Sequence, residues 1–443
     1  MIQSLLNWFI ALTPLSQALI RVGLIVLPLL MLVPMFIWWE RRLLSWMQDR
    51  IGPNRVATFT FGDRWPERLR GKKIRIWGLL QPIADGVKLF LKEDITPANI
   101  DRFIYFLAPA VALFPAFAIS ATLPWGPNPM FTPVADVNIG VLYIIAISSL
   151  GVYGVVLAGY GSNNKYSLLG GLRASAQLIS YELAMGMALA GVVLATGSLK
   201  LTDMVKAQEG PLWGAVPALQ NWFIFTPFGA VSALIFLICM VAETNRAPFD
   251  LPEAENELIA GYHTEYSSMK FAVFFMGEYA AMFIFGGIFA AVFMGGYNFL
   301  PLNWDVLAQQ IPAGKGLFNF LGGLNTSLAG VWFLGKCAGG ITFYIWLRAT
   351  LPRLRYDQLM NLGWRTLLPI AVANFIVVAL WITCTTVYGP TGGWIAVAAA
   401  ALVLGTAYTV MRRMMAANSP TSEPRVLVMS DGKGVEYVES VHG

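Results

Sequence analysis

The chain carries nine apolar stretches that are each long enough to cross a lipid bilayer as a helix. One crossing needs about 20 mostly apolar residues. With 57% hydrophobic and 12% charged residues, the composition excludes an ordinary soluble domain. The sequence therefore predicts an all-α, polytopic membrane helical bundle. The predicted spans lie near residues 18–39, 103–123, 139–160, 174–196, 223–242, 270–294, 328–349, 366–387 and 393–411.

Lys and Arg are distributed unevenly among the predicted loops, and basic loops are retained on the cytoplasmic side. The first, third, fifth and seventh loops and the C-terminal tail hold 25 of the 30 basic residues. We therefore expect a multi-pass membrane protein whose N-terminus lies outside and whose C-terminus lies in the cytoplasm. The net charge of +5 indicates topology more than nucleic-acid binding, although the basic face could also dock partner proteins or anionic lipid. Residues 1–17 lack a basic region and a cleavage site, so the first span is expected to be a retained helix.

Carboxylates are concentrated between the fifth and sixth predicted spans. The fifth span ends at Glu243, and the sixth carries Glu278. An ionisable group at mid-membrane costs about 3 kcal/mol or more on insertion scales, so such residues usually face a protein interior and mark a proton or ion route. The pattern predicts a carboxylate path from a loop to membrane depth. The acids of the loop are Asp250, Glu253, Glu255, Glu257 and Glu265.

Cysteine and histidine are too scattered to hold a redox centre or a metal. Cys239, Cys337 and Cys384 stand singly in predicted spans, whereas His263 lies in a loop and His442 at the C-terminal tip. Neither an iron–sulfur spacing nor a buried histidine pair for haem is present. Any part in electron transfer would therefore consist of shaping a site for a mobile carrier that is reduced elsewhere.

The first cytoplasmic loop contains an amphipathic segment at 77–92 that is too short and too polar to span the bilayer. It is either one wall of a lipid-facing entrance for an amphiphile or a surface helix that anchors the loop. Its apolar residues recur at helical spacing and are Leu79, Leu80, Ile83, Val87 and Leu91.

Five stretches, in order along the chain, resemble one family. The match covers about residues 18–390, and the family is the membrane-embedded H subunit of the bacterial proton-pumping NADH:quinone oxidoreductase, respiratory complex I. The stretches are WWERRLLSWMQDRIGPNRV at 38–56, WGLLQPIADGVKLFLKED at 77–94, LRASAQLISYELAMG at 172–186, AETNRAPFDLPEAENELIAGYHTEY at 242–266 and RATLPRLRYDQLM at 348–360.

The resemblance implies a membrane protein that forms much of a quinone-binding chamber and couples quinone reduction to proton translocation. Quinone is then the substrate, whereas FMN and iron–sulfur clusters belong to other subunits. The implied partners are hydrophilic quinone-site subunits on the cytoplasmic side, small membrane subunits leading to an antiporter-like arm, and phospholipid.

The resemblance also assigns residues to these two roles. The implied chamber residues are Glu40, Arg41, Gln48, Arg50, Asp85, Phe275, Arg348, Arg353 and Arg355. The implied proton-path residues are Arg173, Tyr181, Glu182, Glu243, Asp250, Glu253, Glu255, Glu257, Glu265, Glu278 and Lys336.

Several of these residues have a second interpretation. Phe275 either lies near the quinone passage or only packs within its span. Arg41 either holds an acidic partner or a quinone oxygen, or it only extends its charged end toward water. Glu182 either exchanges a proton in a low-dielectric site or is a neutral, hydrogen-bonded side chain. Lys336 either pairs with an intramembrane carboxylate or reaches toward the outer face.

In the fifth loop, Glu253 and Glu257 would be neighbours on a helical turn and would repel each other. Protonation or pairing with Arg246, Arg353 or Arg355 would relieve this repulsion, and quinone reduction could shift the balance. The alternative is a solvated acidic turn.

Two segments depart from the family pattern, namely an insertion-like stretch at 57–76 and a ninth span followed by a polar tail. The predicted domains are a core at 1–390 with eight spans, an extra helix at 391–415 and a cytoplasmic tail at 416–443. Two other functions fit the sequence less well, the membrane anchor of an energy-converting hydrogenase and an ion-coupled secondary transporter.

Overall fold

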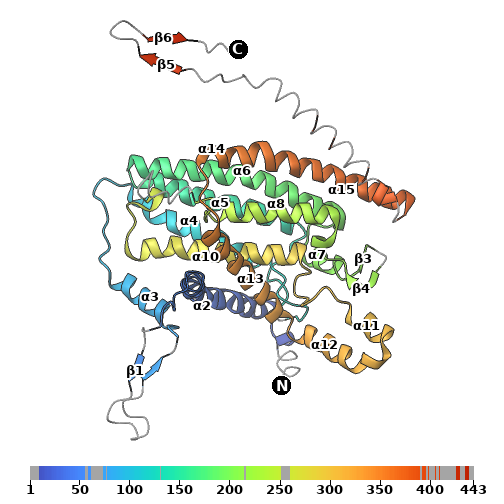
Figure 1. Cartoon of the computed structure of the whole chain (residues 1–443). Coiled ribbons are helices and arrows are strands. Elements are labelled where there is room, and N and C mark those ends of the chain that lie inside the picture. Colours follow the sequence, from blue (N-terminus) through green and yellow to red (C-terminus); the bar gives the residue numbers. More distant parts are fainter. Residues whose placement is uncertain are drawn as a thin grey trace. The chain divides into compact units, whose positions relative to one another are not determined.

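In this computed structural model the chain is a bundle of long helices with very little strand (Figure 1). The structure describes residues 9–54, 58–60, 73–75, 77–129, 131–213, 216–250, 260–389, 392–395, 398, 405, 409, 426–429 and 435–438. The α-helices are α2 (Pro14–Met47), α3 (Gln81–Leu91), α4 (Arg102–Ser120), α5 (Gly140–Gly161), α6 (Lys165–Thr196), α7 (Leu201–Ala207), α8 (Pro227–Glu243), α10 (Ser268–Phe293), α11 (Trp304–Gln310), α12 (Lys315–Ser327), α13 (Ala329–Thr350), α14 (Tyr356–Asn361) and α15 (Leu368–Tyr388).

The remaining elements are short. Three antiparallel strand pairs occur among the described residues, with Thr58 opposite Arg75 in the first. The strands are β1 (Thr58–Thr60), β2 (Lys73–Arg75), β3 (Pro211–Leu212), β4 (Val216–Gln220), β5 (Val426–Met429) and β6 (Val435–Val438). The 3₁₀ turns are η1 (Phe223–Phe225), η2 (Gly261–His263) and η3 (Pro312–Gly314). A π-helical segment, η4 (Leu362–Leu367), lies between α14 and α15.

Six of the described helices are long and apolar enough to cross a membrane, and α12 with α13 adds a seventh if this pair, bent by 72°, is one span. The shorter apolar helix α8 has 17 residues. These helices fall where the first eight spans were predicted, which confirms the all-α membrane bundle. Most of the predicted ninth span at 393–411 lies outside the described residues.

Helix α10 lies at the centre of the packing. It contacts α4, α13, α8 and α2, and apart from Lys270 and Glu278 its residues are mostly apolar on every side, as expected for a buried helix. On its flank, α4 packs closely on α5, because Gly154 lets the two backbones approach. A Cβ atom at Gly154 would lie 2.6 Å from the backbone nitrogen of Ala112.

The predicted amphipathic helix of the first loop is present as α3. It begins at Gln81, later than expected, because Trp77 and Gly78 adopt positive φ angles of 43° and 73° and form a turn. Helix α3 contacts α2 and α10, and it exposes apolar side chains such as Ile83 and Phe90.

The chain divides into two compact units, Met1–Ile382 and Thr383–Gly443. The first unit contains all helices from α2 to α14 and every candidate site residue that the structure describes. The second contains the end of α15 and the β5–β6 pair.

Candidate functional site

Glu40, near the end of α2, is the centre of a buried charged cluster. Its side chain is 7% exposed. Its carboxylate accepts hydrogen bonds from the Tyr279 hydroxyl and from Nη1 of Arg348. Three helices, α2, α10 and α13, therefore meet at one carboxylate.

Arg246, from the segment after α8, joins Glu40 to a second carboxylate. Its Nη1 lies 3.9 Å from Oε1 of Glu40, and its Nη2 lies 3.4 Å from Oε2 of Glu278. The guanidinium also stacks 4.5 Å from the centre of the Tyr279 ring. We call Glu40, Arg246, Glu278, Tyr279 and Arg348 the central cluster. Its two carboxylates face two guanidinium groups, so a low-dielectric site holds balanced charges.

A cavity of about 90 Å³ begins beside this cluster. Glu278 and Glu243 line it, as does Tyr262, whose hydroxyl donates to Oε1 of Glu278 at 3.3 Å. Oε2 of Glu243 is sealed from solvent and has no hydrogen-bond partner among the described residues. Both predicted intramembrane acids of this region therefore face one internal space.

Glu182, on α6, is linked to the same cavity through α5. Its carboxylate accepts hydrogen bonds from the hydroxyls of Ser148, at 3.3 Å, and Ser149. Ser148 also lines the cavity. The contacts agree with both interpretations of Glu182, since a serine hydroxyl can support a proton-exchanging carboxyl or a permanently neutral one.

The other predicted residues of α6 have structural contacts. Tyr181 is buried, and its hydroxyl donates to the backbone oxygen of Leu359 at 2.9 Å. Arg173 lies 5.2 Å from the centre of the Tyr356 ring. Both contacts join α6 to α14.

Only part of the fifth loop can be compared with expectation. Asp250 is 6% exposed and pairs with Arg353 at 2.7 Å, so one predicted path residue meets one predicted chamber residue. Arg246 belongs to the central cluster instead. The acids Glu253, Glu255 and Glu257 lie outside the described residues.

His263, in η2, is buried among aromatic rings. The Tyr262 ring lies 3.7 Å away and that of Phe275, a predicted chamber residue, lies 6.1 Å away. Burial lowers the pKa of His263 to about 3, and the positive charge of Arg246 acts in the same direction. The imidazole is therefore neutral at physiological pH.

The first loop contributes a more exposed set of contacts. Arg41 pairs with Asp85 of α3 at 2.7 Å, and Gln81 donates to the same carboxylate at 3.0 Å. Arg41 thus has the acidic partner that one of its interpretations required. Arg50 donates to the side chain of Gln48.

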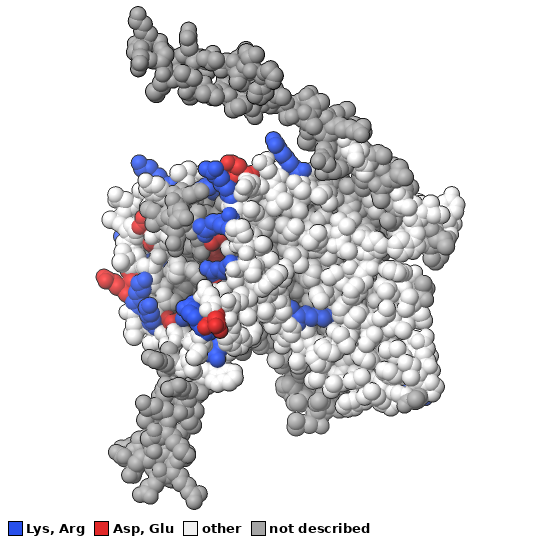
Figure 2. Space-filling view, viewed as in Figure 1, with Lys and Arg blue, Asp and Glu red and all other residues white. Residues whose placement is uncertain are grey.

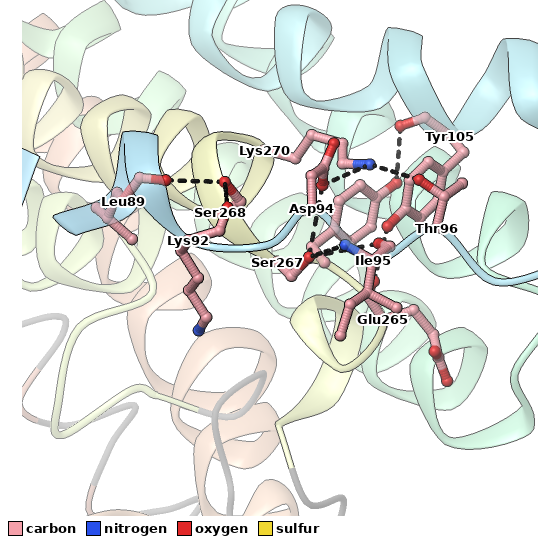
Figure 3. Close-up of polar contacts among 11 residues, drawn as sticks. Leu89, Lys92, Asp94, Ile95, Thr96, Tyr105, Glu265, Ser267, Ser268 and Lys270 are labelled. Carbon is pink, nitrogen blue, oxygen red and sulfur yellow. Dashed lines mark hydrogen bonds and ion pairs between the residues drawn. The ribbon is translucent and has the colours of Figure 1, made fainter. Parts of the chain in front are cut away.

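A polar strap fixes the segment after α3 to the start of α10 (Figure 3). The Ser268 hydroxyl lies 2.8 Å from the carbonyl oxygen of Leu89 and 3.1 Å from that of Lys92, and these two acceptors share its single proton. Lys270 pairs with Asp94 at 3.0 Å and bonds Thr96 at 3.1 Å.

Two further predicted residues have local roles. Glu265 accepts a hydrogen bond from the Tyr105 hydroxyl on its backbone oxygen at 2.7 Å and one from Asn164 on its carboxylate at 2.7 Å. Arg355 precedes α14, and its backbone N–H donates to the side chain of Gln358 at 3.2 Å.

Lys336 forms no ion pair among the described residues. Its ammonium donates to three backbone carbonyls beyond the end of α10, those of Met294, Gly296 at 2.9 Å and Asn298 at 2.6 Å. These contacts hold the ammonium at the end of α10 that lies away from the fifth loop, and no carboxylate in the described part of the chain pairs with it.

Sequence reasoning missed Tyr279, Tyr262, Ser148 and Ser149 as partners of the acids. Tyr279 directly follows the predicted Glu278, and Tyr262 lies within the matching stretch 242–266, so these positions were the available signal. Nothing in the sequence pairs α5 serines with Glu182.

On the face that Figure 2 displays, the charged side chains gather at the end of the bundle where α3 lies, and most of the remaining face is uncharged. Within the described residues, no group of three or more His, Cys, Asp and Glu side chains could hold a metal ion.

Comparisons with known proteins agree on one family. The model of the NADH dehydrogenase family matches residues 20–379. An NADH-quinone oxidoreductase H subunit of Geobacter metallireducens is 44% identical over 370 residues, which cover 82% of this chain and 95% of the relative. The corresponding protein of Koribacter versatilis is 43% identical and covers 82% and 96%, and that of Geobacter sulfurreducens is 44% identical and covers 81% and 94%.

Proposed function

Since this chain belongs to the NADH dehydrogenase family, we propose that it is the membrane subunit of an NADH-quinone oxidoreductase, equivalent to the H subunit of its relatives. In this role it shapes a quinone-binding chamber and couples quinone reduction to proton movement. The electrons arrive through flavin and iron–sulfur clusters on partner subunits. The chain lies in the cell inner membrane with the central cluster toward the cytoplasm.

The central cluster is the single observation that carries the proposal. Removing one member of a buried ion pair leaves an uncompensated charge and costs about 3–5 kcal/mol. A new charge beside the cluster should therefore strongly change the protonation of its carboxylates. Arg348 is the most exposed partner of Glu40, with 39% of its side chain accessible. It is therefore the group through which a ligand at the chamber can act on the buried carboxylates.

The proposed coupling begins when reduction places negative charge on quinone oxygens near Arg348. That negative charge competes with Glu40 for the guanidinium of Arg348. Glu40 must then take up a proton or pair more closely with Arg246. Because Arg246 also holds Glu278, the disturbance reaches the acid that lines the cavity. Quinone finally takes up two electrons and two protons and becomes quinol.

The cavity supports the next step. A water molecule needs about 10–15 Å³ of such space, so about 90 Å³ accommodates several. Waters there would connect Glu278 with Glu243 and, through Ser148, with Glu182. This is the carboxylate path that carries protons into the membrane in our proposal.

Glu278→Gln in the intact assembly tests the function. We expect quinone reductase rate and proton pumping both to fall at least about tenfold, because the variant loses the charge that Arg246 holds. Reduction of a water-soluble acceptor that takes electrons before quinone should not change. Exposed Glu209, changed to Gln, is the matched control. Normal pumping by Glu278→Gln would overturn the proposal.

Copurification gives an independent check against the hydrogenase anchor and the transporter. A large assembly with flavin and iron–sulfur spectra and NADH-dependent quinone reduction is expected. An isolated oligomer that exchanges ions without NADH would contradict it.

A further inference from the structure

A second cavity, of about 300 Å³, lies in the opposite half of the bundle from the central cluster. Along α2, Arg21 at this cavity precedes Glu40 by 19 residues, which is about 28 Å at 1.5 Å per residue. The hydrocarbon core of a bilayer is about 30 Å thick. Along α2, Arg21 and Glu40 are therefore separated by about the thickness of that core.

The length of this cavity along α2 is close to the thickness of the hydrocarbon layer of one leaflet. Its α2 wall runs from Arg21 to Leu32, about 16 Å along the helix, and half a hydrocarbon core is about 15 Å. Apart from Arg21 and two hydroxyl residues, the wall is apolar or aromatic, and it includes Leu328 and Val331 at the junction of α12 and α13.

Two polar donors on this wall lack acceptors. Nε of Arg21 and Nε1 of Trp125 are sealed from solvent and have no hydrogen-bond partner among the described residues. Nor does any described acid pair with Arg21, whose guanidinium lies 5.4 Å from the centre of the Phe9 ring. Buried donors are costly to leave unpaired, and a guanidinium suits a phosphate in particular.

We propose that this cavity is a binding site for one phospholipid. Its phosphate binds the guanidinium of Arg21, and one acyl chain lies along α2 toward the bilayer centre. An amphiphile with an acidic head and an apolar tail of one-leaflet length matches both the positive charge of Arg21 and the length of the apolar wall. The site is separate from the quinone chamber and does not depend on the proposed coupling.

The test uses the intact assembly in lipid nanodiscs that contain phosphatidylglycerol with a photoreactive diazirine on one acyl chain. Illumination should label peptides that carry Leu24 or Leu328. Arg21→Gln should reduce this labelling about tenfold, the effect of losing one charged hydrogen bond, and Arg21→Lys should restore much of it. Val331→Trp, which fills the cavity and keeps the charge, should reduce labelling as well.

Lys206→Gln is the matched control, because Lys206 is exposed, carries the same charge and is expected on the same membrane side. A diacylglycerol with the same reactive chain tests the headgroup. Equal labelling by diacylglycerol, equal labelling of Arg21→Gln, or cross-linking of this wall to another protein subunit in place of lipid would each overturn the proposal.

Discussion

The guanidinium of Arg246 lies 3.4 Å from the carboxylate of Glu278, and the same guanidinium reaches Glu40 on another helix. One arginine thus holds two buried acids that are 238 positions apart in the chain. This contact ties the segment after α8 to both α2 and α10. The position of Arg246 therefore determines whether a change in the charge of one acid affects the protonation of the other.

Arg246→Leu should be the most damaging single change in the cluster. It leaves two largely buried carboxylates without their shared partner, which should lower the free energy of unfolding by about 3–5 kcal/mol. Thermal unfolding of the purified assembly measures this loss. Arg365→Leu, at an exposed position, should have little effect. Equal unfolding temperatures for both variants would show that Arg246 does not stabilise the cluster.

Tyr279→Phe removes the hydroxyl and keeps the ring, so it tests the two contacts of this side chain separately. The ring remains to stack on Arg246, but the hydrogen bond to Glu40 is lost, and a hydrogen bond to a charged group contributes about 1.5–3 kcal/mol. We expect a clear drop in quinone reductase rate in an assembly of normal composition. In a double-mutant cycle with Glu40→Gln, the effects should be non-additive by at least about 0.5 kcal/mol. Strict additivity would contradict a direct role for this bond.

The helices were the part of the fold that the sequence predicted best. Apolar length alone places α4, α5 and α10, because in lipid the backbone must satisfy its own hydrogen bonds and a helix does so. The helix boundary in the first loop was predicted too early, at residue 77 in place of Gln81. The start of α3 depends on the turn at Trp77 and Gly78, which the apolar spacing does not encode.

The candidate site was predictable as a set of residues but not as a set of pairs. Glu278 could be singled out because charges inside apolar spans are rare, whereas Glu40 and Arg348 were assigned by the family resemblance. Their convergence depends on how α2, α10 and α13 pack, and one chain's residue pattern does not specify that packing. Lys336 shows the same limit, because its partners are backbone carbonyls, which every residue has.

Lys336→Met tests whether this lysine has a structural role. The variant removes an ammonium that three carbonyls share, so we expect a loss of about 1.5–3 kcal/mol in the free energy of unfolding. The number of protons pumped per electron should remain the same. Fewer protons pumped per electron at unchanged stability would instead support a role for Lys336 in the proton path.

Ser268→Ala should loosen the polar strap of Figure 3. The single hydroxyl proton of Ser268, which two carbonyls at the end of α3 share, is lost, and such a hydrogen bond contributes about 1 kcal/mol. Amide hydrogen exchange in peptides covering α3 should become about fivefold faster or more. Ser175→Ala is the control, because the Ser175 hydroxyl bonds only its own helix, at Leu172. Unchanged exchange in α3 would mean that other contacts hold the segment.

The buried state of His263 predicts a pH dependence of stability. In the folded chain its pKa is lowered to about 3, whereas an unfolded chain has the ordinary value of about 6.5. Between these values the unfolded chain binds a proton that the folded chain does not, so stability falls as the pH drops below about 6.5. At pH 5 the loss is about 2 kcal/mol, at 1.36 kcal/mol per pH unit.

His263→Phe removes this titration and suits the aromatic surroundings of the ring. The difference in unfolding temperature between the original chain and His263→Phe, measured from pH 8 to pH 5, isolates the histidine because every other titrating group is common to both. The difference should stay constant above about pH 6.5 and then shift in favour of His263→Phe as the pH falls. A constant difference down to pH 5 would mean that the imidazole takes up a proton as readily in the folded chain as in the unfolded chain. The prediction of a buried, neutral His263 would then be wrong.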